Sequence, residues 1–208
     1  MDGIFDYANT DFTKTVHKKL YPAIDPGRSE LDQTGKTVLI TGGGDNLGLA
    51  IGHAFIKAHA KTIIITGRRL DVLEQAKKEL DEANSSTTVH AHTLDVSDIA
   101  QINAFWDKMQ KPGVVVDTLV SNAARPPQPQ PVLEDPDEIW KQIETNAKGP
   151  LYMLKRFCSQ PGDGQKVGPN DAVCTSRLDA NFCSLWSMCH PQSCTATLIL
   201  LCKLDPVQ

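Results

Sequence analysis

Short apolar runs alternate with amphipathic helical stretches between residues 36 and 157, and this alternation constrains the fold more than any other feature. Each run is rich in β-branched residues and has the length of a buried strand, whereas the intervening stretches repeat apolar residues at helical spacing. The expected strands are 37–41, 62–66, 88–94 and 114–120. Because strands joined by helical crossovers pair in parallel, the pattern predicts an α/β fold with a doubly wound parallel sheet.

The rest of the chain lacks this regularity, which predicts three parts. Residues 1–33 form an N-terminal arm, 34–157 the regular domain, and 158–208 an irregular C-terminal tail, aberrant or disordered, that holds all six cysteines. The sheet is therefore expected to be incomplete, with about four strands and the fourth strand at its exposed edge. An exposed strand edge and an apolar face without a partner favour association, so a homo-oligomer stays open.

Charge and hydropathy exclude several classes of partner. The formal net charge is −4 and no run of Lys and Arg is present, so no nucleic-acid partner is expected. The start lacks an apolar signal segment and the apolar run 198–202 is too short for a bilayer, which predicts no membrane association and a cytoplasmic protein. The cysteines lack C-x-x-C spacing, so no metal is expected, although a metal-binding tail is an alternative.

A glycine-rich turn, Thr41-Gly42-Gly43-Gly44-Asp45-Asn46-Leu47-Gly48, joins the first expected strand to the first expected helix. Glycines there let the backbone turn tightly and approach a diphosphate, while the helix N-terminus offers free N–H groups and the positive end of its dipole. Many strand-to-helix turns use glycine for structure alone, and that alternative stays open. The place between a buried strand and a helix favours a nucleotide site.

Two arginines, Arg68 and Arg69, follow the second expected strand. A site for NAD usually has an acid here to bind the adenosine ribose, whereas guanidinium groups suit a 2′-phosphate. The expected cofactor is therefore NADP, with NAD less favoured. Two alternatives are that the arginines are merely exposed at a helix start, or that Asp71, deeper in the next helix, is the ribose acid.

Five motifs in order resemble the short-chain dehydrogenase/reductase family, and the arm from Phe12 to Pro26 resembles fungal members of that family. The resemblance implies that 34–157 is an NAD(P)-binding Rossmann-like domain. The turn matches the family pattern Thr-Gly-x-x-x-Gly-x-Gly except at Asn46, where the family has glycine. Asparagine tolerates left-handed backbone better than other non-glycine residues. The expected cofactor-binding residues are Thr41, Gly42, Asn46, Leu47, Gly48, Arg68, Arg69, Asp95 and Asn122.

The resemblance also implies individual roles. Asp95 would bind the adenine amino group, and Asn122 would steady the central sheet. Asn146 is the expected catalytic residue, because the family holds a proton-relay water at this asparagine on an irregular helix. Gly149 and Pro150 would produce the irregularity, since proline lacks the N–H that continues the helix.

The function that the resemblance implies is an NADP-dependent oxidoreductase, which moves a hydride between nicotinamide and a carbonyl or alcohol carbon of a small-molecule substrate. The family's chemistry uses a Tyr-x-x-x-Lys pair. Tyr152 is the last tyrosine, and Arg156 follows it at that spacing. Ser176 stands at the distance of the family's substrate-binding serine, but no strand is expected around it.

The alternative function is therefore a catalytically inactive NADP-binding fragment, truncated before the Tyr-x-x-x-Lys pair. The family pattern stops abruptly near Phe157, where the cysteines begin. We hypothesise that the residues from about Cys158 onward derive from another reading frame or a retained intron.

Overall fold

The structure, a computed structural model, describes residues 21–84, 86–110, 113–126 and 135–160, together with the backbone of 171–178 and 196–199. Most of the expected arm and most of the expected tail lie outside these residues. The elements are two 3-10 turns (Pro22–Ile24 and Ser29–Leu31), β1 (Thr37–Thr41), α1 (Asn46–Lys57), β2 (Thr62–Gly67), α2 (Leu70–Ala83), β3 (Thr88–Thr93), α3 (Ile99–Gln110), β4 (Thr118–Ser121), α4 (Pro136–Ile143), a π-helical turn (Glu144–Lys148), α5 (Gly149–Cys158), β5 (Asp171–Leu178) and β6 (Ala196–Ile199).

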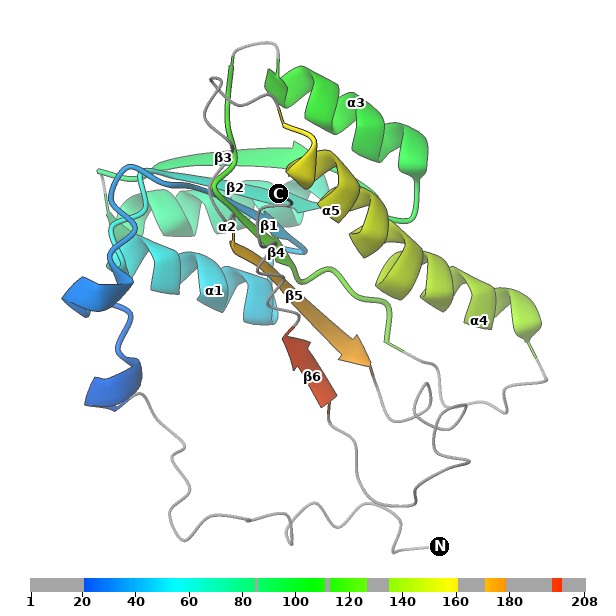
Figure 1. Cartoon of the computed structure of the whole chain (residues 1–208), viewed down its shortest axis with the longest axis horizontal. Coiled ribbons are helices and arrows are strands. Elements are labelled where there is room, and N and C mark those ends of the chain that lie inside the picture. The colour runs from blue at the N-terminus through cyan, green and yellow to red at the C-terminus, as the bar shows by residue number, and fades with distance from the viewer. Residues whose placement is uncertain are drawn as a thin grey trace, which may run out of the picture.

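The strands form one sheet in the order β3-β2-β1-β4-β5-β6 (Figure 1). β1 pairs in parallel with β2 on one side and with β4 on the other, and β2 pairs in parallel with β3. The chain therefore builds outward through β2 and β3 before it returns across β1 to β4. This confirms the predicted doubly wound α/β sheet. In such sheets ligands bind beyond the carboxyl ends of the strands, where the strand order reverses.

Two strands within the expected tail extend the sheet beyond β4. β5 pairs in parallel with β4, and β6 pairs antiparallel with β5. The expectation that β4 forms the edge is therefore corrected. Ser176, around which no strand was expected, lies in β5 opposite Leu198 of β6. The β5 sequence, Asp-Ala-Val-Cys-Thr-Ser-Arg-Leu, has three consecutive apolar residues, of which only Val173 is a branched aliphatic residue, so its apolar run is weaker than those of β1 and β2.

Successive side chains of the central strands enter two separate apolar cores. Val38 and Ile40 of β1 belong to the core under α1 and α2, whereas Leu39 belongs to the core under α3 and α5. Strand side chains alternate between the two faces of a sheet, and helices cover both faces, so Val38 to Thr41 of β1 and Ile63 to Thr66 of β2 are all buried (Figure 1). This burial explains why these strands are continuous apolar runs in the sequence.

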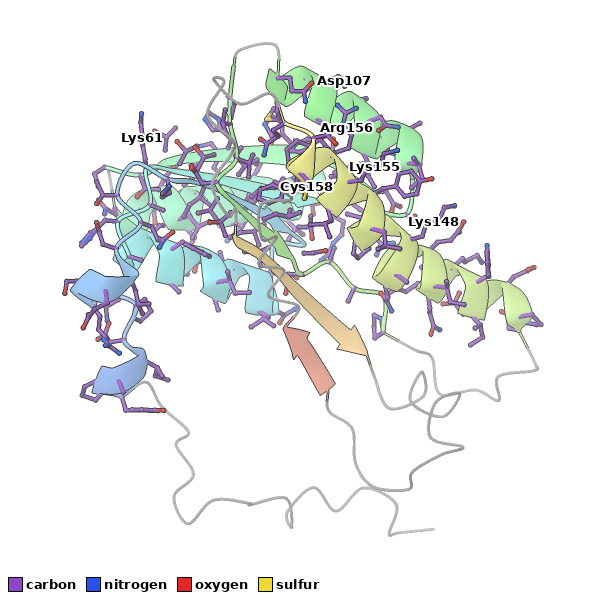
Figure 2. All side chains as sticks on the ribbon, viewed as in Figure 1. Lys61, Asp107, Lys148, Lys155, Arg156 and Cys158 are labelled. Carbon is purple, nitrogen blue, oxygen red and sulfur yellow. The ribbon has the colours of Figure 1, made fainter. Side chains whose placement is uncertain are left out.

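Helices α3 and α5 pack against each other on one face. The Trp106 and Phe157 rings are fully buried there, with their centroids 6.4 Å apart. An ion pair between Arg156 of α5 and Asp107 of α3 closes the outer edge of this contact (Figure 2). The contact holds α5, and with it the π-helical turn before it, against the sheet.

Candidate functional site

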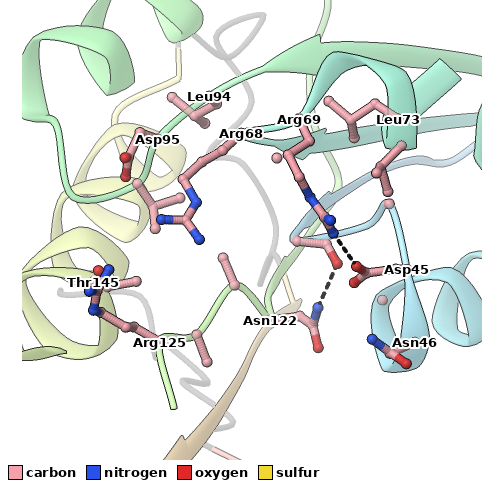
Figure 3. Close-up of a pocket in the computed structure, with 18 of the residues that line it drawn as sticks. Asp45, Asn46, Arg68, Arg69, Leu73, Leu94, Asp95, Asn122, Arg125 and Thr145 are labelled. Carbon is pink, nitrogen blue, oxygen red and sulfur yellow. Dashed lines mark hydrogen bonds and ion pairs between the residues drawn. The ribbon is translucent and has the colours of Figure 1, made fainter. Parts of the chain in front are cut away.

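A cavity of about 690 Å³ lies beyond the carboxyl ends of β1, β2, β3 and β4. The loops that follow these four strands supply its lining (Figure 3). Every cofactor-binding residue predicted from the sequence lines this cavity except Thr41. The charged side chains and glycine of its lining include Gly42, Asp45, Arg68, Arg69, Asp95 and Arg125.

The glycine turn brings the chain too close to its neighbours for side chains. Gly42 has a φ of +63°, and a Cβ there would lie 2.9 Å from the Cα of Ala123. A Cβ on Gly48 would lie 2.0 Å from the Gly42 carbonyl oxygen. Asn46, which stands where the family has glycine, adopts a φ of 45°. The turn therefore keeps the left-handed backbone that glycine usually provides.

Helix α1 begins directly at this turn, and its first three residues line the cavity. The first N–H groups of any α-helix lack partners within the helix. Asp45 is the N-cap residue of α1, and its side chain makes no cap hydrogen bond. These amides, on Asn46, Leu47 and Gly48, form the kind of site that binds phosphate or diphosphate.

Two arginines reach the cavity from the end of β2, and they differ in their surroundings (Figure 3). Arg69 donates a hydrogen bond from Nη2 to the Asp45 carboxylate, with an N–O distance of 2.7 Å. Arg68 has no ion pair within the described part of the chain. Both side chains are exposed. The end of β2 thus supplies the cavity with two arginines, of which Arg69 is paired with Asp45 and Arg68 has no ion pair among the described residues.

Thr41 and Asn122 tie β1 to β4 beneath the cavity floor. The Thr41 hydroxyl, which is buried, accepts hydrogen bonds from the backbone N–H groups of Asn122 and Ala123, both at 3.0 Å. The Asn122 amide donates to the carbonyls of Thr41 and Gly42, also at 3.0 Å. Thr41 therefore supports the site without lining it, and Asn122 has the sheet-linking place that the resemblance implies.

Asp95 lines the cavity at the end of the chain segment that follows β3. Its Oδ1 accepts hydrogen bonds from the backbone N–H of Ser97 at 2.9 Å and from the Ser97 hydroxyl at 2.7 Å. This local turn orients the carboxylate. The contact with adenine that the resemblance implies stays a prediction.

Asn146 lies in the π-helical turn, at the helix irregularity expected from the sequence. Its side chain accepts a hydrogen bond from the backbone N–H of Arg125 at 2.8 Å and donates one to the Arg125 carbonyl at 2.9 Å. Asn146 itself does not line the cavity, although the neighbouring Thr145 does. A Cβ on Gly149 would lie 2.3 Å from the Val96 carbonyl oxygen, so glycine lets this helix approach the β3–α3 loop.

Arg125 is a cavity residue that the sequence analysis missed. Its guanidinium forms a bidentate ion pair with Glu138 of α4, with an Nε–Oε1 distance of 2.7 Å and an Nη2–Oε2 distance of 2.8 Å. The hydrogen bonds from Arg125 lower the pKa of the Glu138 carboxyl, and Glu138 in turn raises the pKa of Arg125. No short-range pattern links the two residues, because the intervening loop has no regular period.

Within the described residues, no helix is both long and apolar enough to cross a bilayer. In that same part of the chain, no group of His, Cys, Asp or Glu side chains is placed to hold a metal ion. The cysteine described with its side chain, Cys158, is exposed at the end of α5 (Figure 2).

Comparison with known proteins agrees with this architecture. Residues 36–167 match the short chain dehydrogenase family. The short chain dehydrogenase pigC of Monascus ruber is 33% identical over 165 residues, which are 76% of this chain and 52% of that protein. The short chain dehydrogenase/reductase dpmpG of Macrophomina phaseolina is 35% identical over 122 residues, which are 58% of this chain and 69% of that protein. The chain belongs to the short-chain dehydrogenase/reductase family, a family of oxidoreductases.

Solved structures share the fold. A short-chain type dehydrogenase/reductase from Mycobacterium ulcerans superposes with a TM-score of 0.61 at 22% identity, over 69% of this chain and 52% of that one. L-sorbose reductase from Gluconobacter frateurii, solved with NADPH and L-sorbose, superposes with a TM-score of 0.55 at 26% identity, over 61% of this chain and 47% of that one. The chain spans about half the length of pigC and of these structures.

Proposed function

We propose that this chain forms the NADP-binding site of an oxidoreductase that moves a hydride between nicotinamide and a carbonyl or alcohol carbon of a small molecule. The observation that carries the proposal is the combination of uncapped amides at the start of α1 with Arg68 across the same cavity. The amides suit a diphosphate, and a guanidinium without an internal partner suits a 2′-phosphate. NADP carries both groups.

The residues present fit this cofactor in their chemistry and in the space they leave. A cavity of about 690 Å³ is within the usual range for cofactor sites. Gly42 and Gly48 keep the turn free of side chains beside the amides. When bound, the nicotinamide supplies the hydride chemistry, and the protein binds and orients it.

NADP is favoured over NAD because of the residues that follow β2. The segment Gly67-Arg68-Arg69 offers no acid that could accept hydrogen bonds from ribose hydroxyls. Asp71, the alternative ribose acid, does not line the cavity. The related L-sorbose reductase was solved with NADPH, which supports the same choice.

The binding test compares a change at Arg68 with a charge-matched control. Arg68→Gln should weaken NADPH binding roughly tenfold or more and leave NADH binding nearly unchanged, because a charged hydrogen bond to the 2′-phosphate is lost. Lys61→Gln removes an equal charge just before β2, at the far end of that strand, and should change neither affinity. The measurement is the rise in dihydronicotinamide fluorescence on binding, recorded in separate titrations with NADPH and with NADH.

Turnover needs a separate measurement. Oxidation of NADPH by the full chain against a panel of ketones and quinones tests the hydride-transfer half of the proposal. Tyr152 packs against the core beneath α5, and Arg156, four residues later, pairs with Asp107. NADPH binding without oxidation of NADPH would support the alternative of a catalytically inactive NADP-binding protein.

A further inference from the structure

The side chain of Asp45 does not do what its position predicts. An aspartate at a helix N-cap normally accepts hydrogen bonds from the backbone N–H groups of the second or third helical residue, here Leu47 or Gly48. Asp45 has the extended backbone of an N-cap, with φ −152° and ψ 174°, yet its carboxylate makes no cap hydrogen bond. Some other contact therefore holds the carboxylate.

That contact is Arg69. The Asp45 Oδ2 atom lies 2.7 Å from Arg69 Nη2, across the cavity wall from the end of β2 (Figure 3). Both residues line the cavity. Within the described part of the chain, this ion pair is the polar contact of both side chains, so the position of one determines the position of the other.

The pair has two consequences for an anion at the start of α1. A carboxylate that capped α1 would occupy the amides and repel a diphosphate, and Arg69 holds it away from them. The charge of Arg69 is meanwhile neutralised by Asp45 at close range, which leaves Arg68 as the cavity cation at the end of β2 without an ion pair among the described residues.

We propose that Arg69 is a positioning residue, which holds the Asp45 carboxylate off the α1 amides and so allows any dinucleotide diphosphate to bind, while Arg68 alone reads the 2′-phosphate. The inference rests on the proposed function. It assigns different tasks to two adjacent arginines that look equivalent in the sequence.

NADH separates the two tasks, because it has the diphosphate and lacks the 2′-phosphate. Arg69→Gln should weaken NADH and NADPH binding by a similar factor, on the order of threefold, the scale of one partly exposed charge pair. The ratio of the two affinities should stay within about twofold of the starting value, in contrast to its fall in Arg68→Gln. NADH affinity is measured by a direct titration, from the rise in NADH fluorescence on binding.

A double-mutant cycle tests whether Asp45 is the cause. In an Asp45→Asn background no carboxylate remains to compete with the diphosphate, so Arg69→Gln should no longer weaken NADH binding. Asp45→Ala serves as a second background, because Asn retains a hydrogen-bond acceptor and Ala does not. Asp71→Asn removes the same charge in the first turn of α2, outside the cavity lining, and should leave the Arg69→Gln effect intact.

Two results for Arg69→Gln would contradict the role assigned to Arg69. If Arg69→Gln weakens NADPH alone and leaves NADH unchanged, both arginines read the 2′-phosphate and the inference is overturned. The same holds if Arg69→Gln weakens NADH equally with and without Asp45. If the unaltered chain folds but binds neither dinucleotide, the proposed function fails first and the inference fails with it.

Discussion

Gly48 shows how a single residue determines the geometry of the first crossover. A Cβ at this position would lie 2.0 Å from the Gly42 carbonyl oxygen and 2.8 Å from the Asn122 amide nitrogen. Neither neighbour is free to move, because Asn122 also ties β1 to β4 through the carbonyls of Thr41 and Gly42. The close approach of α1 to the sheet therefore depends on glycine.

Gly48→Ala should lower the free energy of unfolding by about 1–3 kcal/mol, the usual cost of forcing extra volume into a packed site. It should also weaken NADPH binding, because the turn has to open. Denaturant unfolding and NADPH titration measure the two effects. Gly67→Ala is the control, since its Cβ would meet Leu73 at an ordinary 3.5 Å, and equal losses in both variants would contradict the prediction.

Asn46 is the second residue with a specific backbone demand, since its φ of 45° is one that few side chains tolerate. Asn46→Gly, which restores the family residue, should leave the free energy of unfolding nearly unchanged. Asn46→Ala should lower it by about 1–2 kcal/mol, because alanine lacks the local hydrogen bonding that lets asparagine adopt this conformation. Denaturant unfolding compares the two variants, and equal stability would show that the backbone is not strained.

At the scale of elements, polar contacts of Arg125 hold the residues directly after β4 to α4 and to the π-helical turn. Glu138 of α4 forms an ion pair with the Arg125 side chain, and the Asn146 side chain of the π-helical turn hydrogen-bonds the Arg125 backbone. Asp135 caps α4 by accepting a hydrogen bond from the Glu138 N–H at 3.0 Å. The residues directly after β4, which line one side of the cavity, are therefore positioned by α4 and by the π-helical turn that holds the expected catalytic asparagine.

The ion pair predicts an acid sensitivity. Arg125 lowers the pKa of the Glu138 carboxyl below its ordinary 4.5, so the pair stabilises the fold above pH 4.5 and this contribution is lost as the pH falls through the lowered value. Glu138→Gln should therefore be less stable than the unaltered chain at neutral pH, and the difference should shrink in acid. Unfolding free energies measured across this range test the prediction, and a difference that grows in acid would contradict it.

At the scale of the whole molecule, the cavity joins both cores. Its walls come from the glycine turn above the α1–α2 core and from the β4 and π-helical segments above the α3–α5 core. A ligand held between these walls binds the native arrangement and not the unfolded chain, so it should stabilise the entire fold.

NADPH should therefore raise the melting temperature of the full chain in a concentration-dependent way. At free NADPH of about 100 times the Kd, the expected stabilisation is about 2.7 kcal/mol. Differential scanning fluorimetry measures the shift. Arg68→Gln should show a smaller shift at the same concentration. An equal shift in both proteins would contradict the proposal that Arg68 binds the 2′-phosphate.

The order of strands and helices, the glycine turn and the helix irregularity at Asn146 follow from the sequence because each depends on neighbouring residues. Burial of β1 and β2 on both faces leaves continuous apolar runs, and the demands of a tight turn leave glycines. The places of Gly42 and Gly48 in the turn could be predicted for this reason, whereas the place of Asn122 was expected from the family resemblance. β5 was not recognised in the same way, because its apolar run, Ala172 to Cys174, contains only one branched aliphatic residue.

Which charged side chains pair with each other was decided only by the tertiary structure. The sequence places Arg68 and Arg69 side by side, but the fold brings Asp45 to Arg69 and leaves Arg68 facing the cavity. It likewise buries Thr41 below the site and joins Arg125 to Glu138. Local patterns reflect the periodicity and backbone needs of each element, whereas the pairing of charges depends on which side chains distant segments bring within a few ångströms of each other.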